Sequence, residues 1–154
     1  MRVTRIRQIK LPVTDLASSA KWYRDLLGLS LVHEFEERGV VRGVVLTDLE
    51  SGVVVGLRER DHCEGTPRLD GFDVVAFELD SVAAVREFSA QCDRRAIEHS
   101  EIHDRGQFGV AMDVPDPDGT VLRFVAGQFV SDNFVGLAFD DGAPQMYSEP
   151  RLPV

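Results

Sequence analysis

The stretch VPDPDGTVLRFV, at residues 114–125, holds a turn that leads directly into a strand. Pro115 and Pro117 cannot donate backbone hydrogen bonds to a sheet, and Gly119 tolerates a positive φ, so the chain must reverse direction here. The residues after the turn are mostly β-branched or apolar, which favours a strand. The stretch therefore predicts a tight acidic turn followed by a strand of a sheet.

The same arrangement occurs earlier, because DLESG at residues 48–52 precedes VVVGL at residues 53–57. Gly52 and Gly119 lie 67 positions apart. A second landmark repeats with nearly the same period, since Asp15 and Ser81, 66 positions apart, each precede a helical pattern. Two independent landmarks with nearly one period indicate two copies of one structural unit.

Each copy is predicted to contain a strand, a helix and three further strands. In the first copy we expect a strand at residues 5–13, a helix at 16–27 and strands at 29–36, 40–48 and 53–58. In the second copy we expect a strand at residues 71–79, a helix at 82–94 and strands at 95–102, 107–113 and 120–126.

These elements predict a single domain over residues 1–127, followed by a tail. The domain divides into a first module at about residues 5–60, a linker at 61–70 and a second module at about 71–127. Residues 128–154 contain spaced aromatic side chains, so we expect this tail to pack on the domain or on a dimer partner.

Composition limits the classes of partner. The chain has 154 residues, of which 44% are hydrophobic, enough for the core of one compact domain. A net charge of −9 opposes nucleic acid binding, and no stretch is apolar for long enough to be a signal peptide or membrane span. Cys63 and Cys92 show neither metal spacing nor a disulfide framework. We therefore expect a cytoplasmic protein that binds neither nucleic acid nor membrane.

Three motifs resemble the vicinal oxygen chelate superfamily, which includes glyoxalase I, bleomycin-resistance proteins and extradiol dioxygenases. They are QIKLPVTDL at residues 8–16, WYRDLLG at 22–28 and DPDGTVLRF at 116–124. The resemblance covers residues 5–127 and implies an α+β fold, in which two tandem βαβββ modules form a partial barrel around a ligand cup. It also implies a homodimer, in which modules from two chains often complete each cup.

The resemblance further implies where a metal would bind. In metal-using relatives the ligands come from the first and last strands of each module, and the matching positions here are Gln8, Gly56, Val74 and Arg123. Gln8 offers a carbonyl oxygen, but Gly56 and Val74 have no donor side chain and Arg123 is cationic. Because a catalytic cation needs three or four nitrogen or oxygen donors, we expect no metal and no other cofactor.

Strand alternation predicts what else faces the cup, because residues of equal parity on a strand share one face. The predicted ligand-binding residues are Gln8, Lys10, Gly56, Arg58, Val74, Glu78 and Arg123. Their neighbours of opposite parity are apolar and would pack under the helices. Such a cup suits a mostly apolar ligand with an anionic or carbonyl group. The alternative is that Arg123 and Glu78 neutralise each other and bind nothing.

Histidines give two further hypotheses. His99, Glu101 and His103 alternate along the strand expected near residues 95–102, a spacing that can hold a metal but also suits an exposed polar strand end. For a reaction without metal, His103 is the first candidate general base, and Glu78 is the second catalytic candidate.

The sequence leaves three functions open. The favoured one is a metal-free protein that binds a small organic molecule. The second is an enzyme of the lyase, isomerase or dioxygenase kind, working without metal or with a relocated metal site. The third is a structural or regulatory dimer whose cup is vestigial.

Overall fold

A computed structural model describes residues 2–127, 135–138 and 145–153 of the chain. The first module contains β1 (Ile9–Val13), α1 (Leu16–Leu27), β2 (Ser30–Glu37), β3 (Val40–Thr47) and β4 (Val54–Glu59). The second contains β5 (Asp73–Glu78), α2 (Val82–Arg94), β6 (His103–Asp104), β7 (Val110–Pro115) and β8 (Val121–Ala126). Two short 3-10 turns, η1 (Arg60–His62) and η2 (Gly106–Phe108), and two strands near the C-terminus, β9 (Gly136–Ala138) and β10 (Gln145–Tyr147), complete the described elements.

The two modules have the same topology, so the repeat predicted from the sequence is confirmed. The first sheet has the order β1-β4-β3-β2 and the second has the order β5-β8-β7-β6. In each, the module's first and last strands run parallel. Lys10 lies opposite Gly56 in the first sheet, and Ala76 lies opposite Arg123 in the second. These two pairs are equivalent under the sequence repeat.

Both helices begin and end where the sequence predicts. Asp15 caps α1 by accepting a hydrogen bond from the Ser18 backbone N–H at 2.9 Å, and Gly28 ends that helix with a φ of 68°. Ser81 caps α2 by accepting from the Ala84 backbone N–H at 3.1 Å. Local capping chemistry therefore sets the bounds of both helices.

The core lies between each sheet and its helix. Along β8, buried and half-buried residues alternate. Leu122, Phe124 and Ala126 are buried, and Phe124 packs against Phe88 of α2 with ring centroids 4.4 Å apart. Arg123 lies on the other face of the sheet. This alternation confirms that the apolar side chains on one face of β8 pack under the helix, while the side chains between them lie on the open face.

The prediction of a strand at residues 95–102 is wrong. After α2 the chain turns, because the Ile97 N–H donates to the Cys92 carbonyl at 2.9 Å and Ala96 adopts a φ of 51°. A regular strand cannot pass through that conformation. The next strand is the short β6, which begins at His103.

The strand predicted at residues 107–113 is shifted, since β7 spans Val110–Pro115. The cause is Gly109, which adopts a φ of 83° and approaches the Ala126 carbonyl so closely that no Cβ would fit. The turn at Gly109 must therefore be complete before β7 can begin.

The first strand also starts later than the predicted residue 5. Ile9 is the first residue of β1 and pairs with Val55, whereas β4 itself begins at Val54. Residues 2–7 lie beyond the end of that partner strand and are extended without strand pairing.

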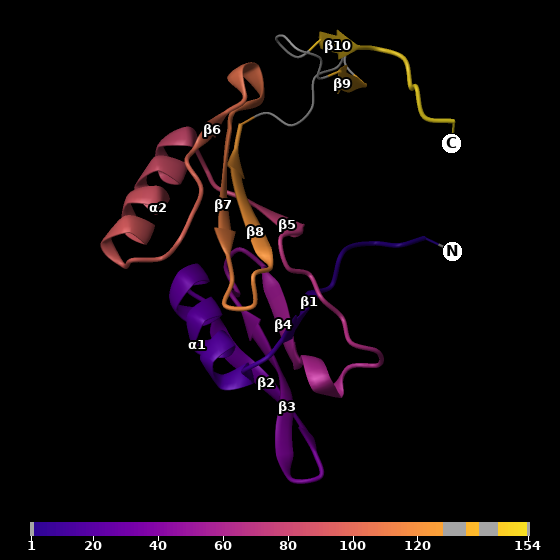
Figure 1. Cartoon of the computed structure of the whole chain (residues 1–154), viewed down its shortest axis with the longest axis vertical. Coiled ribbons are helices and arrows are strands. Elements are labelled where there is room, and N and C mark those ends of the chain that lie inside the picture. The colour runs from indigo at the N-terminus through magenta and orange to yellow at the C-terminus, as the bar shows by residue number, and fades with distance from the viewer. Residues whose placement is uncertain (1, 128–134, 139–144, 154) are drawn as a thin grey trace.

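The described sheets are not closed into a barrel. No strand pairing joins the first sheet to the second among the residues that the structure describes. Figure 1 shows α1 and α2 on the left, with the strands of their own modules to their right. Each sheet is thus covered by one helix and leaves its other face open.

The tail is described only in part. β9 and β10 form an antiparallel hairpin, and the Gln107 side chain donates to Met146 Sδ at 3.1 Å. Residues 128–134 and 139–144, which include Phe129, Phe134 and Phe139, lie outside the described residues. Packing of the tail on the domain or a partner stays a prediction. No described helix is long and apolar enough to cross a membrane.

Candidate functional site

A groove of about 630 Å³ lies on the open face of the first sheet. Its apolar floor includes Phe35 of β2, Val45 of β3 and Val54 of β4. The extended N-terminal segment forms one wall and brings Arg5 and Arg7 to the groove. Gln8, His33 and Thr47 add polar groups at its lining.

A smaller hollow of about 220 Å³ shares Phe35 and Val45 with this groove. Lys10, Gly56 and Arg58 line it, so this face carries the predicted binding residues of the first module. A Cβ at Gly56 would lie 3.2 Å from Lys10 Cγ and 3.9 Å from Gln8 Cδ. The missing side chain of Gly56 therefore leaves room for Lys10 and Gln8 to cross the face of the sheet.

Arg58 is not a free cation on this face. Its guanidinium donates to a Glu37 carboxylate oxygen at 2.5 Å and to the His62 carbonyl at 3.0 Å. The hydrogen bond from Arg58 lowers the pKa of Glu37, which keeps this carboxylate charged. The pair neutralises most of the positive charge that the sequence places at Arg58.

The open face of the second sheet holds Val74, Glu78 and Arg123, as strand parity predicts, but Arg123 has different partners. Its Nε and Nη2 donate to the two oxygens of Asp113 at 2.8 and 2.9 Å, and its Nη1 forms an ion pair with Asp73. The alternative in which Arg123 and Glu78 neutralise each other is therefore wrong, because the carboxylate partners of Arg123 are Asp113 and Asp73.

Sequence reasoning missed the Arg123 clamp because it placed the strand of Asp113 three residues too early. With β7 at its observed position, Asp113 is the direct cross-strand neighbour of Arg123. The hydrogen bonds from Arg123 lower the pKa of Asp113 below its ordinary value. A strand placed from Val110 onward would have revealed this pair.

The two catalytic candidates lie on opposite edges of the second sheet. Glu78 is on β5 and His103 is on β6, with β8 and β7 between them. Neighbouring strands are about 4.8 Å apart, so three strand spacings separate the two backbones by roughly 14 Å. Glu78 and His103 are therefore not placed to act together as an acid–base pair on one substrate atom.

The relocated metal site proposed for His99, Glu101 and His103 has no geometric support. The strand that would align them is absent, and His99 is engaged by the Ser100 carbonyl at 2.7 Å and by Asp93 at 3.2 Å. The described part of the chain contains no group of three or more His, Cys, Asp or Glu residues suited to a metal ion.

The superfamily's usual metal position does not fit a cation either. Gln8 directly precedes β1 and Gly56 lies on β4 of the first sheet, whereas Val74 and Arg123 lie on the second sheet. Only Gln8 has a donor oxygen, and Arg123 is a guanidinium held by two carboxylates. A divalent ion has no adequate set of donors among these four side chains.

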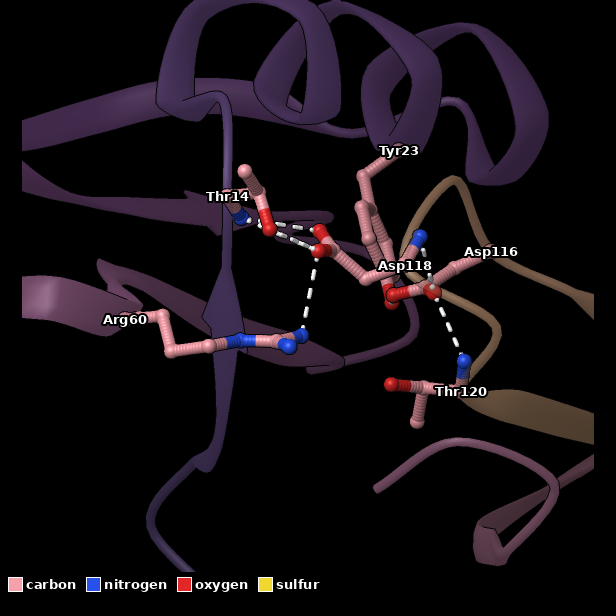
Figure 2. Close-up of polar contacts among 6 residues, drawn as sticks. All are labelled: Thr14, Tyr23, Arg60, Asp116, Asp118 and Thr120. Atoms are coloured by element: carbon pink, nitrogen blue, oxygen red, sulfur yellow. Dashed lines mark hydrogen bonds and ion pairs between the residues drawn. The ribbon is translucent and has the colours of Figure 1, made fainter. Parts of the chain in front are cut away.

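The acidic turn that decides the fold also joins the two modules (Figure 2). Asp118 accepts hydrogen bonds from the Thr14 backbone N–H at 2.9 Å and from the Thr14 hydroxyl at 2.5 Å. It also pairs with Arg60 Nη2 at 3.0 Å, and both of these charged side chains are largely buried. The sequence identified Asp118 as a turn residue, but its contacts with Thr14 and Arg60 of the first module are tertiary.

Asp116 makes a second link between the modules. It is 5% exposed and accepts a hydrogen bond at 2.7 Å from the hydroxyl of Tyr23, which lies on α1 and is fully buried. The backbone N–H groups of Asp118 and Thr120 donate to it at 2.9 and 2.8 Å. Burial raises the pKa of Asp116, while these three donors oppose that rise.

The family of the chain follows from its sequence over most of its length. A model of the Glyoxalase/Bleomycin resistance protein/Dioxygenase superfamily matches residues 5–124. The chain belongs to this superfamily. A comparison with curated protein sequences finds no match.

Solved structures of superfamily proteins share the fold. A glyoxylase/bleomycin resistance protein/dioxygenase domain from Frankia sp. EAN1pec has a TM-score of 0.68 and 20% identity, covering 83% of this chain and 95% of that chain. A lactoylglutathione lyase from Agrobacterium tumefaciens has a TM-score of 0.63 and 18% identity, covering 82% and 96%.

The fosfomycin resistance protein FosX from Listeria monocytogenes has a TM-score of 0.65 and 17% identity, covering 83% of this chain and 97% of that chain. FosX is also described in a complex with Mn(II) and sulfate ion. At these identities the likeness concerns the fold alone.

Proposed function

We propose that this superfamily member binds a small organic molecule without a metal ion, in a cup whose floor is the groove on the first sheet. The observation that carries the proposal is the groove itself, about 630 Å³ in volume with an apolar floor and a few polar groups. Sites for small molecules commonly enclose about 300–1,000 Å³ and have this mixture of lining groups.

The chemistry of the metal position supports binding without metal. Arg123 places a cation at a position where metal-using relatives have a metal ligand, and its two carboxylate partners hold it there. A guanidinium has no lone pair to offer a metal ion, and Asp113 and Asp73 are engaged as its partners. FosX, described with Mn(II), therefore shares the fold with this chain but gives no model for its ligand site.

We also propose that a second copy of the chain completes the cup with its second module. All eight residues of β2 are exposed, and Phe35 is 52% exposed. On the open face of the second sheet Val74 is 36% exposed, and Phe72 just before β5 is 58% exposed. Exposed apolar side chains on the open faces of sheets are typical of interaction surfaces.

The other two hypotheses have less support. An enzyme would need cooperating groups, and Glu78 and His103 lie on opposite sheet edges. A vestigial cup would be filled by its own side chains or by the aromatic tail, whereas the described residues leave the groove on the first sheet open. Cys63 and Cys92 are both free, which is consistent with the reducing cytoplasm we propose as its location.

The direct test is ligand binding by protein that has been treated with a chelator and desalted, with its metal content measured by plasma mass spectrometry. A thermal-shift screen with apolar small molecules should find ligands, and calorimetry should then give one site per chain without added metal. Val54→Phe, which fills the groove from a half-buried position, should abolish binding. Binding that requires a divalent metal, or that Val54→Phe leaves intact, would refute the proposal.

A further inference from the structure

The lining of the groove on the first sheet differs in charge from the rest of the protein. The chain has 26 acidic and 17 basic residues, for a net charge of −9. The groove lining contains Arg5 and Arg7 and no Asp or Glu. The charged side chains that line this groove are therefore opposite in sign to the net charge of the protein.

Strand alternation produces this separation. On β2, His33 and Phe35 line the groove, whereas Glu34 between them lines a different hollow beside α1. Asp48, at the end of β3, is directed into its own turn, where it accepts from the backbone N–H groups of Glu50 and Ser51 at 3.1 and 3.0 Å. Glu34 and Asp48, two acidic neighbours of lining residues in the sequence, are thus turned away from the groove.

The two arginines that line the groove have no carboxylate partner among the described residues, unlike two of the other cations on the open sheet faces. Arg58 is paired with Glu37, and Arg123 is paired with Asp113 and Asp73. Neither Arg5 nor Arg7 forms an ion pair with any residue in the described part of the chain. A guanidinium carries five N–H donors in a planar fork that matches the oxygens of carboxylate, phosphate or sulfonate.

We infer that the ligand of this groove is a soluble organic anion with an apolar body and one acidic group. The body lies on Phe35, Val45 and Val54, and the acidic group is bound by Arg5 and Arg7. This inference rests on the proposed binding function, since it names the class of ligand for the same site.

The experiment compares two fluorescent probes with the same aromatic body. 1-Anilinonaphthalene-8-sulfonate is an apolar anion, and N-phenyl-1-naphthylamine is its neutral counterpart. Dissociation constants are measured for the wild type, for Arg5→Gln/Arg7→Gln, and for the control Arg68→Gln/Arg86→Gln. The control removes the same charge from two exposed arginines outside the groove. Thermal unfolding confirms that each variant is folded.

We expect Arg5→Gln/Arg7→Gln to weaken binding of the sulfonate roughly fivefold or more, and to leave binding of the neutral probe unchanged. The control should change neither constant. Raising NaCl from about 50 mM to about 500 mM should weaken binding of the sulfonate probe and leave binding of the neutral probe unchanged. Equal loss in the groove variant and the control, or no loss in either, would overturn the inference.

Val54→Phe separates this inference from the function on which it rests. If both probes bind the wild type and Val54→Phe removes them, the groove is a binding site whatever the arginines do. If both probes bind Val54→Phe as tightly as the wild type, the proposed function fails and the inference fails with it. Should Val54→Phe not fold, Val32→Trp fills the groove from a residue that is 40% exposed.

Discussion

Two aspartates of the second module have pKa values shifted in opposite directions, for reasons that lie in their neighbours. Arg123 donates two hydrogen bonds to Asp113 and lowers its pKa. Asp116 is buried at the module junction, and desolvation raises its pKa. Asp113 therefore stabilises the fold at pH values above the ordinary pKa of an aspartate, and this contribution is lost as pH falls through its lowered pKa. The contribution of Asp116 is present below the ordinary pKa of an aspartate and is lost as pH rises through its raised pKa.

The contribution of Asp116 can be isolated with Asp116→Asn. Between the ordinary aspartate pKa and the raised value, the folded state binds the proton more tightly than the unfolded state, so this group's contribution to stability decreases as pH rises. We expect the free energy of unfolding of the wild type, minus that of Asp116→Asn, to decrease from about pH 4 to about pH 7. Urea unfolding across this range measures it. The other carboxylates are common to both proteins, so a difference independent of pH would contradict the assignment.

Tyr23→Phe tests the hydrogen bond across the junction. It removes the hydroxyl that donates to Asp116 at 2.7 Å and leaves a buried carboxylate with one donor fewer. Such a loss costs about 1–3 kcal/mol in the free energy of unfolding. Urea denaturation should give this decrease, whereas Tyr147→Phe, in the C-terminal hairpin, should change stability by less than about 0.5 kcal/mol. Equal effects of the two substitutions would rule out a special role for the junction.

At the scale of elements, Gly109 fixes the start of β7. It combines a φ of 83° with a close approach to the Ala126 carbonyl, where no Cβ fits. Gly28 is the matched control, because it has a φ of 68° and nothing within 4 Å of a built Cβ. Gly28→Ala should cost about 1 kcal/mol from backbone conformation alone. Gly109→Ala should cost at least about 2 kcal/mol more, since β7 and β8 must separate. Similar losses in thermal or urea unfolding would show that the close approach is relieved without cost.

Elements set by local chemistry could be predicted from the sequence, and elements set by tertiary contact could not. α1 and α2 have the predicted bounds because Asp15 and Ser81 cap them through their own side chains. The error at residues 95–102 has another origin. The sequence predicts a strand there because the second module repeats the order of elements of the first, but the chain is held by a turn onto the end of α2. The repeat gives the order of elements and does not show where each strand begins.

At the scale of the whole molecule, the candidate site was also predicted where strand alternation sets it and missed where tertiary contact does. Parity placed Gln8, Lys10 and Gly56 on one sheet face, where the structure has them together. Their role in binding stays a prediction. Arg5 and Arg7 were not predicted as groove residues, because they reach it from an extended segment without strand alternation. The pairs that neutralise Arg58 and Arg123 depend on cross-strand register, which strand parity alone does not give.

The proposed dimer belongs to the largest scale, because it would cover sheet faces that one chain leaves open. Val74→Glu places a charge on the open face of the second sheet, where Val74 is 36% exposed, so the single chain should fold normally. At an interface with a second copy, the same carboxylate would be desolvated without a partner. We therefore expect sedimentation velocity to give a dimer for the wild type and a shift toward the 17.1 kDa monomer for Val74→Glu.

The control is Ala83→Glu, which adds the same charge to an exposed position of α2, on the covered side of that sheet, and should leave the dimer unchanged. A wild type that sediments as a monomer at every concentration would remove the second copy from the site, and the cup would then consist of the open groove of one chain.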